Sequence, residues 1–400
     1  MALKNNTWKI NQWYDQAVAG NVSYSSPFAG ELWAWGENGN GSLGLNNRTT
    51  YSSPIQVGTD TNWSVLNNSG SEAQLGAGIK SDGTLWMWGR NQYGALGLND
   101  VVLRSSPTQV PGTWLVPNDD VPYNDRTGSI QVRNDGTLAV KSDGTLWSWG
   151  YSNFGQLGDN QGPGNQKSSP TQVGTDTTWK HVTGGDGGNG VAGLKTDGTL
   201  WVWGRNQNGS LGLGSLNEHR SSPTQLPGTT WFGITMQAQT TQAIKTDGTL
   251  WVWGGNNVGQ LGLNNTTNHY SPIQLPGTWR NCGCTVADSQ LAMKTDGTLW
   301  AWGRNEYGEL GVNNRTNYSS PIQIPGTTWV NITASRKGST VLATKSDGTL
   351  WSWGANQKGI LGQNQGPSIT ARSSPTQIPG TWETGRLAGG YANAFAIKEA

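Results

Sequence analysis

Aspartate is the most regularly spaced of the residue types that could carry chemistry. Six aspartates stand in the string K-[ST]-D-G-T, at Asp82, Asp143, Asp197, Asp247, Asp296 and Asp347. If the fold gathered these carboxylates, they could hold cations or act as paired acid and base groups. Glycine follows each of them, however, and Asp-Gly between alternating apolar residues is the strongest short hairpin signal. We therefore interpret the six as the first residues of type I′ turns, with a structural role.

Three arginines share a second recurring string, W-G-R-N, at Arg90, Arg205 and Arg304. At equivalent points of a repeated structure, they could form a partner-binding patch on one rim of it. The alternative is that they are solvated loop residues, because the other copies of the string carry different residue types at this point. Those residues are Glu37, Tyr151, Gly255 and Ala355.

Cysteine and histidine are too scattered to form a metal or nucleophilic centre. Cys282 and Cys284 could supply two sulfur ligands, but no second pair accompanies them and structural zinc needs four ligands. The three histidines (181, 219 and 269) lie in different repeats, without a serine or cysteine nucleophile signature. No glycine-rich phosphate-binding string leads from a strand into a helix. We expect no metal, no cofactor and no enzymatic activity, and we interpret both thiols as buried or half-buried.

The composition is that of a rigid, turn-rich protein. Of 400 residues, 59 are glycine and 23 are tryptophan, and only 13% are charged, which excludes a disordered chain. The net charge is +1 and no basic stripe is present that could displace phosphate counterions, so we expect no nucleic-acid partner. No apolar run is long enough to span a membrane, and the first ten residues lack the apolar segment of a secretory signal.

Most of the tryptophans mark an internal repeat. The string W-x-W-G occurs seven times, at intervals of 49 to 61 residues. G-x-L-G and then S-P-x-Q follow each copy, and a further tryptophan comes after S-P-x-Q, so these positions account for 21 of the 23 tryptophans. The first tryptophans of the seven strings are Trp33, Trp86, Trp147, Trp201, Trp251, Trp300 and Trp351. The tryptophan excess is therefore architectural.

Each repeat is typical of β structure. In L-W-x-W the two tryptophans point to one face of a strand, and Ser-Pro favours an outer, edge-type strand. Seven such units predict an all-β propeller. The K-x-D-G-T-L-W hairpin is complete six times, and its seventh copy is divided between the two ends of the repeat region. We therefore expect residues 30–400 to form a ring that closes by pairing of Ala394–Lys398 with Gly30–Trp35, which leaves no open edge.

The combined strings resemble the regulator of chromosome condensation family. The resemblance rests on D-G-T-L-W-x-W-G, N-x-x-G-x-L-G and S-S-P-x-Q, and it covers roughly residues 30–400. It implies a seven-bladed β-propeller with four-stranded antiparallel blades. The best-known member of the family is a nucleotide-exchange factor for a small GTPase, which it opens with a protruding wedge. That wedge has no residue-by-residue match here and the family's basic tail is missing, so the resemblance does not carry exchange activity to this chain.

Two functions compete. Low charge, abundant Asn, Thr, Ser and Gly, and very similar repeats favour a rigid, exposed module. We expect a non-enzymatic structural or adhesive component of a bacteriophage virion (tail, fibre or capsid decoration) that binds protein or a host-surface glycan and is made in the host cytoplasm without a signal peptide. The alternative is a cytoplasmic protein-interaction scaffold or a small-GTPase exchange factor.

Two segments depart from the repeat. Residues 1–29 precede it and contain Trp8, Trp13, Tyr14 and Phe28. Because aromatic residues dominate interface hot spots, we predict that this segment docks the propeller onto a larger assembly; the alternative is that it packs against its own ring. The longest interval holds Leu115–Asp135, which we interpret as a surface loop, the alternative being a recognition element.

Overall fold

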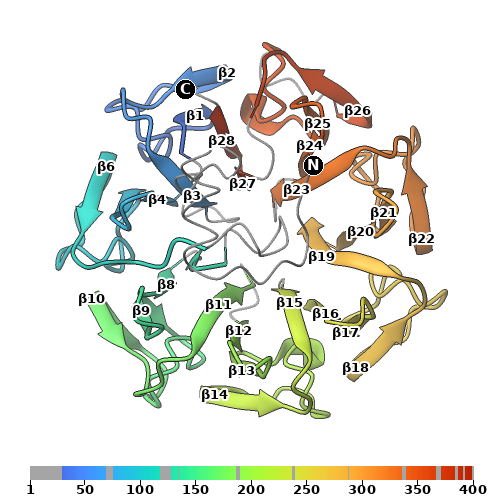
Figure 1. Cartoon of the computed structure of the whole chain (residues 1–400), viewed down its shortest axis with the longest axis horizontal. Coiled ribbons are helices and arrows are strands. Elements are labelled where there is room, and N and C mark those ends of the chain that lie inside the picture. Colours follow the sequence, from blue (N-terminus) through green and yellow to red (C-terminus); the bar gives the residue numbers. More distant parts are fainter. Residues whose placement is uncertain are drawn as a thin grey trace, which may run out of the picture.

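The structure is a closed ring of seven β-sheets. The computed structural model describes residues 29–398 apart from 69–74, 118–127, 134, 186–189, 237–238, 287, 336–338, 366–370, 383–385 and 391. Its strands form seven four-stranded antiparallel sheets around a central axis (Figure 1), which confirms the predicted seven-bladed propeller. Helical structure in these residues is limited to two 3-10 turns, η2 (Gln207–Gly209) and η3 (Gln357–Gly359). None of the described helices is long and apolar enough to cross a membrane.

The blades are numbered along the chain, and the strands of each run from the axis outward. Blade 1 comprises β3 (Trp63–Asn68), β4 (Leu75–Lys80), β5 (Leu85–Gly89) and β6 (Arg104–Val110). Blade 2 comprises β7 (Ile130–Val132), β8 (Gly136–Val140), β9 (Leu146–Ser152) and β10 (Asn165–Gln172). Blade 3 comprises β11 (Trp179–Gly184), β12 (Gly190–Lys195), β13 (Leu200–Gly204) and β14 (Arg220–Leu226). Blade 4 comprises β15 (Trp231–Met236), β16 (Thr240–Lys245), β17 (Leu250–Gly254) and β18 (His269–Leu275). Blade 5 comprises β19 (Trp279–Val286), β20 (Ser289–Lys294), β21 (Leu299–Gly303) and β22 (Tyr318–Ile324). Blade 6 comprises β23 (Trp329–Ser335), β24 (Thr340–Lys345), β25 (Leu350–Gly354) and β26 (Arg372–Ile378). As predicted, each S-P-x-Q string lies in the outermost strand of its blade.

Blade 7 joins the two ends of the repeat region. It comprises β27 (Leu387–Gly389), β28 (Asn393–Lys398), β1 (Glu31–Gly36) and β2 (Tyr51–Gln56). β28 pairs with β1 in an unbroken antiparallel register from Glu31–Lys398 to Gly36–Asn393, and the red and blue strands lie side by side in Figure 1. The predicted ring closure is therefore confirmed.

The K-[ST]-D-G-T hairpins use a different turn from the one predicted. In blade 1, Gly83 N–H donates to the Lys80 carbonyl and Lys80 N–H donates to the Thr84 carbonyl. Gly83 has a φ of +80°, but Asp82 is not among the residues with positive φ. The loop is therefore a type I turn followed by a left-handed glycine, a G1 bulge, and the type I′ prediction was wrong. The glycine alone meets the demand for positive φ, so Asp82 keeps an ordinary right-handed conformation.

The second tryptophan of each W-x-W-G string ties neighbouring blades together. Its side chain is buried, and its Nε1 donates a hydrogen bond of 2.8–3.2 Å to a loop carbonyl of the preceding blade. The seven pairs are Trp35–Ile360, Trp88–Ser42, Trp149–Ala95, Trp203–Gln156, Trp253–Ser210, Trp302–Gln260 and Trp353–Glu309. Each blade thus satisfies a buried donor of the next, which fixes the angle between sheets.

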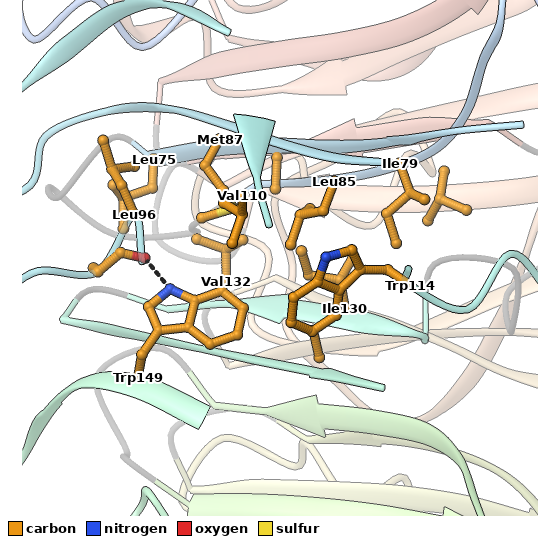
Figure 2. Close-up of a cluster of buried hydrophobic side chains, with 14 residues drawn as sticks. Leu75, Ile79, Leu85, Met87, Leu96, Val110, Trp114, Ile130, Val132 and Trp149 are labelled. Atoms are coloured by element: carbon orange, nitrogen blue, oxygen red, sulfur yellow. Dashed lines mark hydrogen bonds between the residues drawn. The ribbon is translucent and has the colours of Figure 1, made fainter. Parts of the chain in front are cut away.

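The hydrophobic core is divided among the seams between blades. Figure 2 shows one seam, in which Leu75 and Met87 of blade 1 face Ile130 and Trp149 of blade 2. The third tryptophan of each repeat packs within its own blade at an angle to the W-x-W-G pair; Trp63, for example, has its ring centroid 6.1 Å from that of Trp88. Edge-to-face tryptophan contacts of this kind add to the stability that burial supplies.

The two departing segments fall largely outside the description. Residues 1–28, and with them Trp8, Trp13, Tyr14 and Phe28, lie outside the described residues. Of the insertion, residues 118–127 and 134 do too, while Ile130–Val132 forms the short inner strand β7. Both predictions about these segments therefore stay predictions.

Candidate functional site

The two ends of the ring differ in how much the repeats vary. In six of the seven blades the third strand begins at the K-[ST]-D-G-T hairpin, and in every blade it ends at the loop that carries N-x-x-G-x-L-G, where serine replaces the asparagine in blade 2. We call the end with the hairpins the hairpin face and the end with the N-x-x-G loops the loop face. Binding residues gather in loops that a rigid frame holds in place.

The loop face has a constant buried frame. In blade 3, the Asn206 amide oxygen accepts the Leu211 N–H at 2.9 Å, and its nitrogen donates to the Ser215 carbonyl at 2.9 Å. The same asparagine-to-leucine bond recurs in five other blades, from Asn38, Asn91, Asn256, Asn305 and Asn356. These asparagines are at most 2% exposed. In blade 2, Ser152 takes the place of the asparagine, and its hydroxyl lies 3.5 Å from the Leu157 N–H. The residue before this position and the second residue after it vary from blade to blade.

The predicted arginines occupy the variable position before this asparagine. Arg90, Arg205 and Arg304 follow β5, β13 and β21, so they lie on one face but on blades 1, 3 and 5. Each has different surroundings. Arg90 hydrogen-bonds Gln92, whereas Arg304 pairs with Glu306 and lies 4.0 Å from Asp288. The structure thus puts the three arginines on one rim without bringing them together.

A different set of side chains does meet on this face. Tyr93 of blade 1 stacks on Tyr151 of blade 2, with ring centroids 4.9 Å apart and planes 19° apart. At the next seam, the Arg205 guanidinium lies 4.6 Å from the Phe154 ring centroid, and the His219 ring meets Phe154 edge-on at 5.1 Å. We call these five residues the rim cluster. They cover two successive seams, and of their side chains only that of His219 bonds to a frame asparagine.

The charge of the rim cluster comes from Arg205. Desolvation of the imidazole and the nearby Arg205 guanidinium lower the pKa of His219 below its ordinary value. His219 is therefore neutral at neutral pH, and its Nδ1 accepts the Asn206 N–H at 3.1 Å. A guanidinium on an aromatic face, with a stacked tyrosine pair at the preceding seam, gives a surface that is apolar, aromatic and weakly cationic.

Arg205 is the one residue of this cluster that we predicted from the sequence as a site residue. The missed signal was that Tyr93 and Phe154 stand at the same point of the repeat, two residues after the asparagine position. The other blades have Asn40, Asn208, Val258, Tyr307 and Lys358 there. The contact follows from ring order, since this position of one blade touches the residue after W-x-W-G in the next blade.

The hairpin face is more uniform. In blade 3, Trp201 Nε1 donates to the Thr199 hydroxyl at 2.9 Å, and that hydroxyl donates to Asp197 at 2.7 Å. The hydrogen bond from Thr199 lowers the pKa of Asp197, and the six turn aspartates all share this arrangement. Lys195 lies over both Trp179 and Trp201, 4.7 and 3.9 Å from their ring centroids. The carboxylates are thus engaged by their own turns and do not form a shared carboxylate centre.

The remaining candidates stay apart. The Cys282 side chain is buried, and the side chain of Cys284 lies outside the description. His181, His219 and His269 belong to blades 3 and 4 and to different strands or loops. Within the described ranges, no three His, Cys, Asp or Glu side chains are grouped as a metal site would require.

A protein-family model matches most of the chain. The model is described as the regulator of chromosome condensation (RCC1) repeat, and it matches residues 29–67, 82–114, 143–191, 197–235, 247–287, 296–342 and 347–385. Each of these seven matches includes one of the W-x-W-G strings or the tryptophan that follows S-P-x-Q.

Curated relatives match about half of the chain. The Arabidopsis thaliana ultraviolet-B receptor UVR8 is 27% identical over 197 residues, which are 49% of this chain and 42% of the receptor. The mitochondrial RCC1 domain-containing protein RUG3 of the same plant is 30% identical over 217 residues, 52% of this chain and 46% of its own length. Human E3 ubiquitin-protein ligase HERC2 is 29% identical over 199 residues, 50% of this chain and 4% of the ligase. The chain therefore spans less than half the length of these relatives.

Solved structures share the fold. Human WBSCR16 superposes with a TM-score of 0.75 at 20% identity, covering 92% of this chain and 99% of that one. Yeast RCC1 (Prp20), in a structure bound to Kap60, also gives 0.75, at 18% identity over 100% of this chain and 96% of its own. These relatives are proteins of a plant, of human and of yeast, and they give no support to the predicted virion role; the alternative prediction of a protein-interaction module fits them better.

Proposed function

The chain belongs to the RCC1 repeat family, and from this premise we propose that it is a non-enzymatic, protein-binding propeller whose partner binds the rim cluster on the loop face. The rest of the ring acts as the rigid frame that holds this surface. Because one fold hosts many functions, the proposal rests on the site rather than on the propeller itself.

The observation that carries the proposal is the placement of the rim cluster. Tyr93, Tyr151, Phe154 and Arg205 gather on adjacent seams, at positions that the loop frame does not constrain. Tyrosine and arginine are enriched in interface hot spots, where rigid rings bury a large area at a small cost in conformational entropy. A cluster of these residue types at variable positions is the expected form of a partner-specific surface on a shared scaffold.

The family members with solved structures are consistent with this role. One study of yeast Prp20p describes its binding properties to Gsp1p and histones, and another shows yeast RCC1 bound to Kap60. For the present chain, the partner's identity, its cellular location, a virion role and docking through residues 1–29 all remain predictions. The rim cluster supports protein binding without choosing among these settings.

The proposal is tested with a rim variant, in which Tyr93, Tyr151, Phe154 and Arg205 are all changed to serine. A matched control carries Val258→Ser and Lys358→Ser, at the repeat position that Tyr93 and Phe154 occupy, on other blades. Partners are captured by crosslinking the full chain in its source cells, and the affinity of each purified partner is then measured by calorimetry. We expect the rim variant to lose at least roughly tenfold in affinity, while the control binds like the wild type.

A rim variant that melts normally and still binds every captured partner with wild-type affinity would overturn the proposal. Nucleotide exchange is tested separately, by following the release of fluorescent GDP from purified Gsp1p. A catalytic acceleration would establish exchange activity instead of a purely scaffolding role, whereas an unchanged rate is the result we expect.

A further inference from the structure

A groove opens between blades 3 and 4, away from the rim cluster. It has a volume of about 500 Å³ and lies toward the hairpin face. One wall comes from the outer part of blade 3, with Leu213 and Pro227, and the other from blade 4, with Trp251 and Pro272. Lys245 also lines it. A similar groove of about 520 Å³ lies at the preceding seam, between blades 2 and 3, where Lys195 takes the same place.

The two lysines differ in one respect. Both lie over a pair of tryptophans, and Lys245 Nζ is 4.8 and 4.2 Å from the ring centroids of Trp231 and Trp251. Lys195, however, is only 7% exposed and pairs with Asp176 at 2.5 Å, whereas Lys245 is half-buried and has no carboxylate within ion-pair distance among the described residues. Both lysines thus lie over a pair of tryptophan rings, but only Lys195 has a carboxylate partner among the described residues.

The chain itself shows which group can pair with a lysine held over two tryptophan rings. The partner of Lys195 comes from Gly174–Thr177, the segment Gly-Thr-Asp-Thr that connects β10 to β11. Blade 1 repeats the arrangement, since Asp60 of another Gly-Thr-Asp-Thr segment pairs with Lys80 at 2.9 Å. In blade 4 the corresponding connection is Pro227–Thr230, Pro-Gly-Thr-Thr, which contains no acid.

We propose that the groove between blades 3 and 4 binds an acidic, extended segment of a partner protein, whose aspartate or glutamate carboxylate pairs with Lys245. The carboxylate would take the place that Asp176 occupies at the preceding seam. The charges are complementary, and a half-buried lysine on aromatic rings strengthens such a pair relative to an exposed one.

The walls of the groove favour a peptide over a free anion. Leu213, Pro227 and Pro272 offer apolar surface on either side of Lys245, and Gln225 offers a polar group that can bond a backbone. A small carboxylate would gain the ion pair but not these contacts.

The test uses the purified full chain, with its lysines labelled by reductive ¹³C-methylation, which keeps their charge and gives each a resonance. The probe is N-acetyl-Thr-Asp-Thr-amide, which copies Thr175–Thr177; its Asn counterpart and sodium acetate are the comparison ligands. We expect the Asp peptide to shift the Lys245 resonance saturably with a Kd on the order of 1 mM, and acetate to need at least roughly tenfold more. The Asn peptide should leave the resonance unmoved.

Two variants make the result specific. Lys245→Met keeps the stem on the tryptophans and removes the charge, so saturable binding should disappear while the melting temperature stays close to that of the wild type. Asp176→Ala removes the carboxylate and vacates its place beside Lys195, so the Lys195 resonance should begin to respond to the Asp peptide, a gain that a damaged fold would not produce. No shift of Lys245 at high peptide concentration, equal shifts with the Asn peptide, or equal affinity for acetate would each overturn the proposal. None of these outcomes depends on a rim-cluster partner, so the two proposals stand or fall separately.

Discussion

At the residue scale, Glu309 is the side chain whose charge fits its position least well. It is fully buried in the loop of blade 5, where Gln156 and Gln260 occupy the equivalent places in blades 2 and 4. Its Oε2 accepts the Tyr307 N–H at 2.6 Å, as the glutamine oxygens accept the corresponding N–H groups. Burial raises the pKa of Glu309 above its ordinary value of 4.5.

The sign of the resulting pH dependence follows from this shift. A carboxyl whose pKa is raised in the folded state does not lower the free energy of unfolding while it is protonated in both states. It destabilises the fold as the pH rises above the pKa that the carboxyl has in the unfolded chain. Glu309→Gln should therefore increase the free energy of unfolding at pH 7 by about 1–3 kcal/mol, and the gain should vanish near pH 4. Urea unfolding at both pH values checks this; a gain that is equal at both would show that the charge of Glu309 is not its cause.

Thr199 is the central link of the bond chain from Trp201 to Asp197. Thr199→Val keeps the shape but leaves Trp201 Nε1 without its acceptor at a half-buried site, so we expect a loss of about 1–2 kcal/mol in the free energy of unfolding. Thr229→Val, at an exposed threonine, is the matched control and should stay within about 0.5 kcal/mol of the wild type. Equal effects of the two substitutions in urea titrations would contradict a structural role for the hydroxyl.

At the scale of the element, two blades share a variation that the others lack. Gly78 of blade 1 and Gly193 of blade 3 pair with the first tryptophan of W-x-W-G. A Cβ at either glycine would lie 2.7 Å from the inner tryptophan ring of its own blade, Trp63 or Trp179. The equivalent residues of the other blades are Ala139, Ala243, Ala292, Ala343 and Ala396. The glycine blades are also those whose lysine pairs with Asp60 or Asp176, so the glycine and the acidic connection occur together.

This coupling predicts an asymmetry between blades. Gly193→Ala should lower the free energy of unfolding by about 1–3 kcal/mol, because the new methyl group overlaps the Trp179 ring. The reverse change in blade 4, Ala243→Gly, removes only a methyl group and should cost about 1 kcal/mol. Alanine is otherwise favoured over glycine in strands, so a neutral or stabilising Gly193→Ala in denaturant titrations would contradict the tight packing described here.

At the scale of the whole molecule, the ring depends on the closing pair β1–β28. Phe395 of β28 reaches across the seam to Trp88 of blade 1, with ring centroids 5.5 Å apart, and Ile397 is fully buried beside it. Removal of residues 393–400 would delete β28, expose an edge of β1 and uncover this part of the core.

We expect this truncation to lower the melting temperature by about 10 °C or more, since the loss of each large buried side chain costs about 2–5 kcal/mol. The control removes only Glu399 and Ala400 and should melt like the full chain. Thermal unfolding followed by tryptophan fluorescence checks both. If the long truncation also melts like the full chain, blade 7 does not close the ring cooperatively.

The propeller, the number of blades and the closing pair were all predictable from the amino-acid sequence. Each of these depends on local patterns that repeat: the hairpin string, the alternation of L-W-x-W and the Ser-Pro of the outer strand. When seven copies agree, errors in any one of them cancel, and the divided hairpin then shows where the ring must close. The six aspartates were rightly assigned to turns, although the turn type was wrong because Asp82 does not need the positive φ that Gly83 supplies.

Contacts between side chains of different blades, in contrast, could not be predicted from the sequence. Tyr93 meets Tyr151, and Phe154 meets Arg205, across seams between residues about one repeat apart, and ring order rather than local pattern sets those pairs. The same reason separates Arg90, Arg205 and Arg304, whose identical strings lie on alternate blades. The pairing of Lys195 with Asp176 has the same cause, because the aspartate lies in the segment that connects the preceding blade to the blade of the lysine. Short sequence motifs predict the strands and turns of one blade. Contacts between blades join residues that are distant in the sequence, and these contacts depend on how the whole ring packs.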